Sequence, residues 1–125
     1  MAIETQGDTF ETGSLADPVT EDSVLLPRDS DETPVVSVVM PTLNEEDGIE
    51  DCIARVRMGL CELGVVGEVI VSDSSTDRTA ELAREAGAIV VEPDRDGYGY
   101  AYRYAFRHVR GEYVVMGDAD TPYDF

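Results

Sequence analysis

The sequence predicts an α/β domain built on a parallel β-sheet in the strand order 3-2-1-4, with helices on both faces. Four short runs rich in valine and isoleucine, which favour strands, alternate with three segments of helical apolar spacing. The connections between successive runs are too long for hairpins and indicate right-handed crossovers between parallel strands. Polar loops rich in Asp, Asn, Ser and Thr lead from the strands into the helices, as capping requires.

The first strand and helix are expected between residues 34 and 64. The nearly continuous apolar run 35–40 is typical of a strand covered on both faces, and we expect Pro41 to end it. Asn44 is expected to cap the following helix, whose acidic first turn suits the positive end of the helix dipole. One apolar helical face then continues to Gly64, a residue suited to a C-terminal cap.

Three more strands and two helices are expected in the rest of the chain. The loop 73–77 supplies capping residues for a short helix that Gly87 closes. We expect the last strand to be buried because it is short, apolar and β-branched, and we expect Gly117 to end it. Its outer edge is expected to lack a partner strand. The expected strands are 69–71, 88–91 and 112–116, and the expected helices are 79–86 and 100–109.

Residues 1–33 differ from the rest of the chain in composition and pattern, with nine acidic residues, one arginine and no apolar periodicity. We expect them to form a disordered acidic tail, with the folded domain spanning 34–125. A regulatory or partner-binding arm is the alternative, and only its charge favours it. Cys52 and Cys61 fall on one predicted helix about 13 Å apart, too far for a disulfide, so we expect reduced thiols.

The composition is strongly acidic, since 27 acidic residues oppose nine arginines, no lysine is present, and the net charge is −18. This charge argues against nucleic acid and anionic membrane surfaces as partners, because their phosphates would be repelled. It indicates adaptation to a salt-rich cytosol, with an ordinary acidic protein as the alternative. The sequence has neither a basic leader nor an apolar run near the roughly 18 residues of a membrane span. We therefore expect a cytoplasmic location, with the cytosolic face of a membrane as a second option.

The polar motifs are predicted to meet at one edge of the sheet. In open parallel sheets the ligand lies outside the carboxyl ends of the strands, where the strand order reverses. The order 3-2-1-4 puts that point between the first and fourth strands. Carboxylates spaced i, i+2 point the same way in an extended chain and suit Mg²⁺ or Mn²⁺, although an isolated Asp-x-Asp is also common in solvated turns. The residues expected to meet there are Pro41, Thr42, Glu45, Asp73, Asp118 and Asp120.

Four motifs lie in sequence at the predicted strand ends and loops. They are Val-Val-Met-Pro-Thr-Leu-Asn-Glu-Glu at 38–46, Ser-Asp-Ser-Ser-Thr-Asp-Arg-Thr at 72–79, Gly-Tyr-Gly at 97–99 and Met-Gly-Asp-Ala-Asp at 116–120. Together they resemble the opening loop, second strand end, third helix loop and metal-binding Asp-x-Asp of family 2 glycosyltransferases of the GT-A fold. The resemblance covers 35–125 and implies the Rossmann-like N-terminal half of such a domain. Residues 118–125 resemble the branch that transfers hexoses to dolichyl or polyprenyl phosphate.

The resemblance implies a role for each matching residue. Asp73 would accept a hydrogen bond from the nucleobase, since uracil and guanine both present ring N–H donors. Mg²⁺ or Mn²⁺ would bind the diphosphate of a UDP- or GDP-hexose and stabilise the charge that develops on the leaving nucleotide. The implied nucleotide-sugar ligands are Pro41, Thr42, Glu45, Asp73 and Asp118, and the implied metal ligands are Asp118 and Asp120.

Three positions depart from the family's pattern. Ser72 and Ser74 stand where the family often has Asp and Gly, which leaves the nucleobase open. Pro122 stands where some mannosyltransferase relatives carry a metal-side polar group, which favours the hexosyl branch. The resemblance puts the catalytic residues beyond Phe125, so we expect these 125 residues alone to transfer no sugar. The alternatives are a non-catalytic nucleotide-binding or interaction module and a truncated, inactive remnant.

The chain is expected to need salt to fold, because salt screens the repulsion among its 27 acidic residues. The Debye length falls to about 3 Å at 1 M salt, shorter than most distances between surface charges. Circular dichroism from low to multimolar KCl should show helicity and melting temperature rising with salt. Equal values across that range would contradict the expectation.

Overall fold

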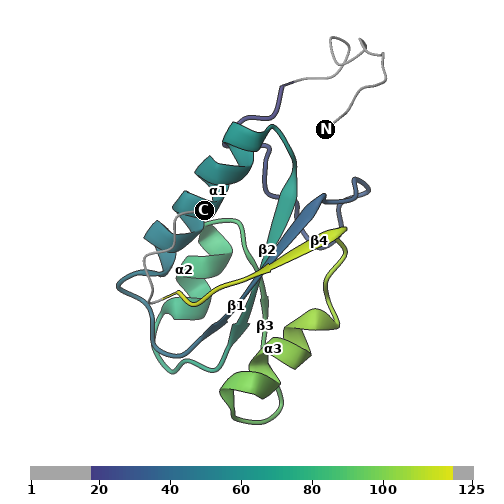
Figure 1. Ribbon diagram of the computed structural model, residues 1–125. Coiled ribbons are helices and arrows are strands. Elements are labelled where there is room, and N and C mark those ends of the chain that lie inside the picture. Colours follow the sequence, from purple (N-terminus) through teal and green to yellow (C-terminus); the bar gives the residue numbers. More distant parts are fainter. Residues whose placement is uncertain (1–17, 120–125) are drawn as a thin grey trace.

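A computed structural model describes residues 18–119 of the chain (Figure 1). The four strands form one parallel sheet in the order β3-β2-β1-β4, which confirms the predicted fold class and strand order. The elements in chain order are β1 (Val36–Thr42), α1 (Ile49–Leu63), β2 (Gly67–Asp73), α2 (Thr79–Glu85), β3 (Ile89–Val91), α3 (Tyr98–Phe106) and β4 (Tyr113–Met116).

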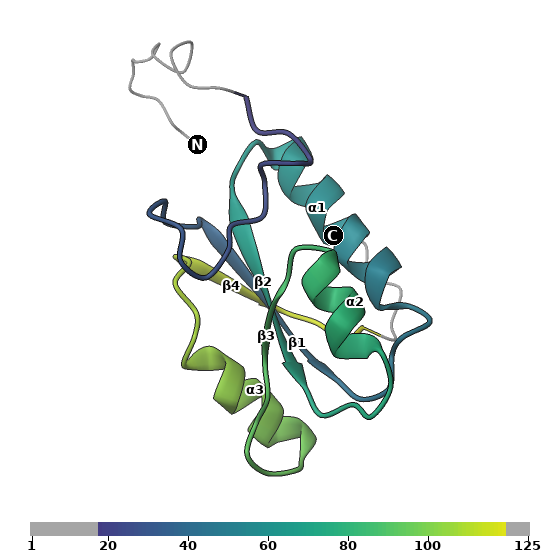
Figure 2. The same cartoon turned by 180° about the vertical axis from the view of Figure 1, so that it is seen from behind.

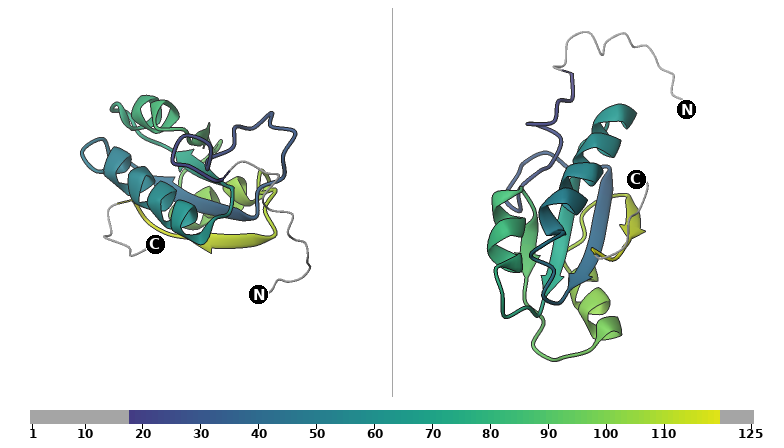
Figure 3. Two further views of the ribbon diagram at one scale, coloured as in Figure 1. Left: turned by 90° about the horizontal axis from the view of Figure 1, so that it is seen from above. Right: turned by 90° about the vertical axis from the view of Figure 1, so that its left-hand side faces the viewer.

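The helices form two layers, one on each face of the sheet (Figures 1 and 2). Successive strand residues point to opposite faces, so Val38 and Val71 pack with α1 and α2, whereas Val39 and Ile70 pack with α3. These four side chains are at most 2% exposed, and they form the two halves of the core. Figure 3 shows the same layers from above and from the side. Within residues 18–119 no helix is long and apolar enough to cross a membrane.

Helix α1 ends as predicted but begins differently. Gly64 follows the helix with φ 72°, a left-handed conformation that glycine adopts without strain. Gly48 precedes it and no side chain caps its first turn, so the expected cap by Asn44 is wrong. The Asn44 side chain bonds instead to the loop after β2. The same helix carries Cys52 and Cys61, both free thiols as expected.

Strand β1 runs through Pro41 to Thr42, so the expectation that Pro41 ends it is wrong. The backbone groups of a strand alternate between its two neighbours. The Val39 carbonyl accepts from Gly117 on the β4 side, and the Thr42 carbonyl accepts from Ser74 on the β2 side. The nitrogen of Pro41 therefore faces the β4 side. Because the register of β1 with β4 ends at Val39, the missing N–H removes no bond from that ladder.

Strand β4 is exposed, which corrects the expectation of a buried strand. Its four side chains, in Tyr113–Met116, are 38–60% exposed. It is the last strand of the sheet, and α3 packs on β1 and β2 rather than over it. Within the described residues its outer edge has no partner strand.

Part of the N-terminal segment that was expected to be a disordered tail packs against the rest of the domain. Val24 is 0% and Leu26 is 5% exposed, and Leu25 makes a parallel bridge to Gly67 at the start of β2. The Gly67 N–H donates to the Val24 carbonyl, and the Leu26 N–H donates to the Gly67 carbonyl, both at 2.8 Å. The packed region therefore begins before residue 34, and the expected boundary is wrong. Residues 1–17 of the expected tail lie outside the described residues.

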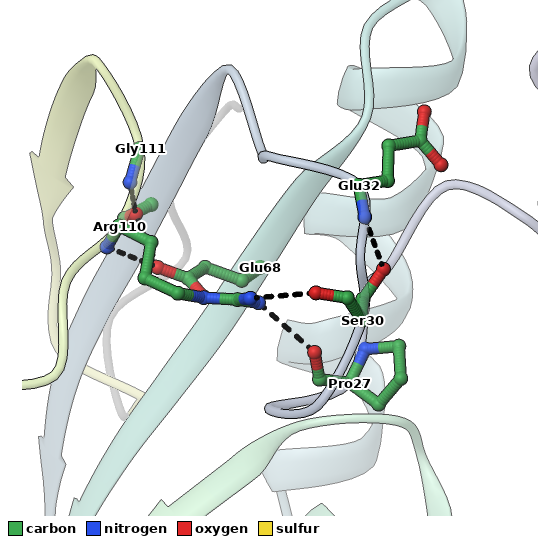
Figure 4. A network of polar contacts seen from close by, with 7 residues as sticks. Pro27, Ser30, Glu32, Glu68, Arg110 and Gly111 are labelled. Carbon is green, nitrogen blue, oxygen red and sulfur yellow. Dashed lines mark hydrogen bonds and ion pairs between the residues drawn. The ribbon is translucent and has the colours of Figure 1, made fainter.

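A buried carboxylate joins this segment to the sheet (Figure 4). Glu68 is 0% exposed, and its Oε2 accepts from the Ser37 hydroxyl at 2.6 Å and from the Arg110 N–H at 2.8 Å. Its Oε1 accepts from Arg110 Nε at 3.1 Å. The guanidinium also donates to the carbonyls of Pro27 at 2.9 Å and Ser30 at 3.3 Å. One arginine thus neutralises the buried charge and holds the segment before β1.

Arg110→Met should lower the free energy of unfolding by about 3 kcal/mol, because it leaves the Glu68 charge buried without its cation. Methionine keeps the unbranched stem, so the loss reports mainly the guanidinium. Arg103→Met is the matched control, since Arg103 is exposed on α3 and its change should stay within about 0.5 kcal/mol. Urea unfolding at constant high KCl measures both. Equal losses in the two variants would contradict the assignment.

Candidate functional site

A cleft of about 580 Å³ lies at the carboxyl edge of the sheet, on the side that α3 covers. Three strand ends and the start of α3 contribute to it, as the reversal in strand order between β1 and β4 predicts. The lining residues are Pro41, Thr42, Leu43 and Glu45 after β1, Ser74 after β2, Asp96, Gly97, Tyr98 and Ala101 around the start of α3, and Asp118 after β4.

The structure brings most of the predicted site residues to this cleft. Pro41, Thr42, Glu45 and Asp118 all line it. Asp73 does not line it but is buried next to Thr42, at the end of the neighbouring strand. The other predicted metal ligand, Asp120, lies outside the described residues. Four of the five described residues therefore meet at one cleft, and the binding roles of all of them remain predictions.

Asp73 is held by two hydroxyl groups. The register of β1 with β2 places Thr42 beside Asp73, and Thr42 Oγ1 donates to Asp73 Oδ1 at 2.7 Å. Ser75 Oγ donates to the same oxygen at 2.5 Å. The carboxylate is 4% exposed, so these bonds replace much of the water that burial removes. They orient the carboxylate at the edge of the sheet.

Asn44 connects the loop after β1 to the loop after β2. Its backbone N–H donates to Ser75 Oγ at 2.7 Å, and its side-chain Oδ1 accepts from the Thr76 N–H at 2.9 Å. Its φ of 56° is left-handed, a conformation that asparagine tolerates better than most residues. Because Ser75 also donates to Asp73, a continuous chain of hydrogen bonds runs from the first loop to the buried carboxylate.

The charge of the cleft is entirely acidic among its described lining residues. Glu45, Asp96 and Asp118 contribute carboxylates, and the lining includes no arginine. Arg95 is adjacent in sequence, but its guanidinium lies over the Tyr100 ring, 5.0 Å from the centroid. A phosphate group entering this cleft would be repelled unless a cation came with it.

Asp118 accepts from two tyrosines of α3. The hydroxyl of Tyr98 donates to Asp118 Oδ1, and the hydroxyl of Tyr102 lies 3.1 Å from the same oxygen and 3.1 Å from the Gly117 carbonyl. Burial raises the pKa of Tyr102 well above its usual range, and the Tyr98 hydroxyl and the Asp118 charge add to the rise, so Tyr102 stays protonated. These tyrosines were not among the residues expected at the site. Their spacing of four residues at the start of a helix beside Gly97 was the available signal.

Comparison with known proteins identifies the family. The model of "Glycosyl transferase family 2" matches residues 37–124. The chain belongs to glycosyl transferase family 2. The match runs from β1 past β4 and includes every cleft residue, which confirms the resemblance seen in the four motifs.

Two of the relatives that come from Haloferax volcanii show how much of such a protein this chain covers. The low-salt glycan biosynthesis hexosyltransferase Agl6 is 62% identical over 104 residues, which cover 83% of this chain and 25% of the relative. A dolichyl-phosphate hexose transferase is 38% identical over 91 residues, which cover 70% of this chain and 37% of the relative. The chain therefore spans about a quarter to just over a third of the length of these proteins.

A solved structure shares the fold. Glucosyl-3-phosphoglycerate synthase from Mycobacterium tuberculosis, in complex with Mn²⁺, UDP and glucosyl-3-phosphoglycerate, superposes with a TM-score of 0.60 at 40% identity. The alignment covers 70% of this chain and 34% of that protein. The likeness supports a GT-A-type arrangement of the sheet and helices here.

The oxygen chemistry of the cleft suits a divalent cation, although the ligand set is incomplete in the described residues. Among residues 18–119 no group of three or more His, Cys, Asp or Glu side chains is close enough to hold a metal ion. Asp118 is the described member of the predicted pair, and Mg²⁺ or Mn²⁺ commonly uses one or two carboxylates, with water and phosphate oxygens completing its coordination. The acidic cleft is therefore compatible with an ion shared between protein and ligand.

Asn44→Ala should lower the free energy of unfolding by about 2 kcal/mol, of which about 1 is lost hydrogen bonding and about 1 the left-handed backbone. Asn44→Gly removes the same side-chain bond but tolerates the conformation, so about 1 kcal/mol is expected. Urea unfolding at fixed KCl separates the two terms. A larger loss for glycine than for alanine would show that the backbone conformation is not the constraint.

Proposed function

We propose that this chain supplies the nucleotide-sugar site of a family 2 glycosyltransferase that moves a hexose from a UDP- or GDP-sugar to dolichyl or polyprenyl phosphate. The observation that carries the proposal is the acidic cleft at the carboxyl edge of the sheet, between β1 and β4. Its carboxylates would repel a diphosphate alone but can hold one through a divalent cation. A nucleotide diphosphate bound with Mg²⁺ or Mn²⁺ matches that requirement.

In this proposal Asp118 and Asp120 hold the cation that the donor diphosphate requires. When bound, that ion neutralises the diphosphate and stabilises the charge that develops on the leaving nucleotide. Before the donor arrives, the hydroxyls of two tyrosines of α3 contact Asp118, which lines the cleft. The solved relative, with Mn²⁺ and UDP in its complex, supports the choice of ligands.

The nucleoside would lie against the ends of β1 and β2. Pro41 and Thr42 offer a rigid wall, and Glu45 also lines the cleft. Asp73 would accept from a ring N–H of uracil or guanine. Since two hydroxyls donate to its Oδ1, the oxygen proposed for the base is Oδ2. The chain of bonds through Ser75 and Asn44 would keep this acceptor in place without help from the ligand.

The sugar and acceptor are proposed from the relatives. Agl6 is named a hexosyltransferase, and the second relative is named a dolichyl-phosphate hexose transferase. A polyprenyl acceptor confines the reaction to a membrane surface, and we place this chain at the cytosolic face of that membrane. Direct displacement needs donor and acceptor held together, so the activity belongs to a protein that also provides the acceptor site.

Calorimetry with UDP and GDP in multimolar KCl tests the proposal. One nucleotide should bind at least about tenfold more tightly with Mn²⁺ than with EDTA, because the cation removes repulsion from the cleft. Asp118→Asn and Asp120→Asn should each lose most of that gain. Asp47→Asn removes the same charge from an exposed position outside the cleft lining and should keep the gain.

Equal nucleotide affinity in Mn²⁺ and in EDTA would contradict the proposed role of the cleft. Metal-dependent binding that survives in both Asp118→Asn and Asp120→Asn would place the cation elsewhere. Nucleotide binding without transfer in a protein that contains the acceptor site would favour the non-catalytic module.

A further inference from the structure

The two tyrosines that meet Asp118 differ in how firmly they are held. Tyr102 is 8% exposed and belongs to the core on the α3 face, with Phe106 stacked at 6.3 Å between ring centroids. Tyr98 is 61% exposed and lines the cleft, and its ring meets Tyr102 edge-on at 5.2 Å. Tyr102 is therefore fixed by packing, whereas the Tyr98 side chain can change rotamer at little cost in buried area.

The hydrogen bonds at Asp118 are redundant. A tyrosine hydroxyl has one proton to donate, and that of Tyr98 goes to Asp118 Oδ1. The Tyr102 hydroxyl lies 3.1 Å from two acceptors, Asp118 Oδ1 and the Gly117 carbonyl. If Tyr98 withdraws, Tyr102 can still donate to Asp118. The exposed hydroxyl is thus not needed to hold the carboxylate.

Given the proposed function, we propose that Tyr98 is a positioning residue that exchanges partners. In the free protein its hydroxyl donates to Asp118, and in the donor-bound protein it donates to an oxygen of the nucleoside diphosphate. A cation at Asp118 repels the positive end of the O–H dipole, so Tyr98 leaves that oxygen when the ion approaches. The hydroxyl then lies in an acidic cleft whose described lining offers no charged donor, and a phosphate oxygen is the strongest acceptor brought there.

If the exchange occurs, Tyr98→Phe should have opposite effects on metal binding and on nucleotide binding. Without the competing hydroxyl, Mn²⁺ alone should bind about fivefold more tightly, the equivalent of one ordinary hydrogen bond. With Mn²⁺ saturating, UDP or GDP should bind about fivefold more weakly, because the phosphate loses a donor. A hydroxyl that only supports the structure would weaken both steps.

Two other tyrosines provide matched controls. Tyr102→Phe removes the fixed hydroxyl, which can donate to the Gly117 carbonyl when an ion occupies Asp118, so it should not tighten Mn²⁺ binding as Tyr98→Phe does. Tyr113 is 60% exposed on β4, and its hydroxyl makes no hydrogen bond to any residue in 18–119, so Tyr113→Phe should change neither step. Binding of Mn²⁺ to Asp118→Asn measures how much of the metal binds to acidic residues elsewhere on the chain.

The experiment uses the 125-residue chain in multimolar KCl. Electron paramagnetic resonance of free Mn²⁺ measures binding of the metal alone, and calorimetry at saturating Mn²⁺ measures binding of UDP and of GDP. The chain has no tryptophan, so ultraviolet emission comes from its six tyrosines. A phenol that donates to a carboxylate is quenched, and adding Mg²⁺ should raise the wild-type emission more than that of Tyr98→Phe, which keeps only Tyr102 beside Asp118. The wild-type measurement alone can overturn release of Tyr98, even if a variant fails to fold.

Tighter Mn²⁺ binding together with weaker nucleotide binding in Tyr98→Phe supports the exchange. Changes of the same sign in both steps, or no change, overturn it while nucleotide binding by the wild type leaves the proposed function intact. A wild-type chain that binds Mn²⁺ but neither nucleotide overturns the proposed function and the exchange together. Wild-type emission that does not respond to Mg²⁺ overturns the release of Tyr98.

Discussion

The candidate site depends on the register in which β1 pairs with β2. This register sets Thr42 beside Asp73, so a hydroxyl at the end of one strand meets a carboxylate at the end of the next. A slip by one residue would turn every side chain of the moved strand to the other face of the sheet and break this contact. Ser75 and Asn44 extend the contact into the loops, so the pairing also determines how the two loops lie.

Much of the fold could be predicted because local spacing controls it. Continuous apolar runs with β-branched residues indicated the buried strands β1 and β2. The apolar face of α1 indicated a helix that ends at Gly64, because glycine suits the left-handed conformation that follows a helix. Strand order followed from general rules for parallel sheets, and the meeting of Pro41 and Asp118 at one cleft followed from strand order.

The errors arose where partners lie far apart in the sequence. Local rules assign Asn44 to a helix cap, but its side chain bonds to Thr76, thirty-two residues later. The acidic composition before residue 34 predicts disorder, yet Val24 and Leu26 find a backbone partner at Gly67. Apolar content predicted burial of β4, but burial depends on which element covers a strand, and no local pattern encodes that. The tyrosine contacts at Asp118 likewise need the packed position of α3.

The Glu68 network has a consequence for how the chain forms during synthesis. Arg110 donates to Pro27 across 83 residues and to Glu68 across 42 residues, so both bonds wait for almost all of the described chain. A nascent chain that has reached only the end of α2 contains the carboxylate but not its cation, and closing the strand around that charge is unfavourable. Completion of the sheet is thus tied to emergence of Arg110 from the ribosome. The bonds that hold Pro27 and Ser30 therefore form late, although these residues are made first.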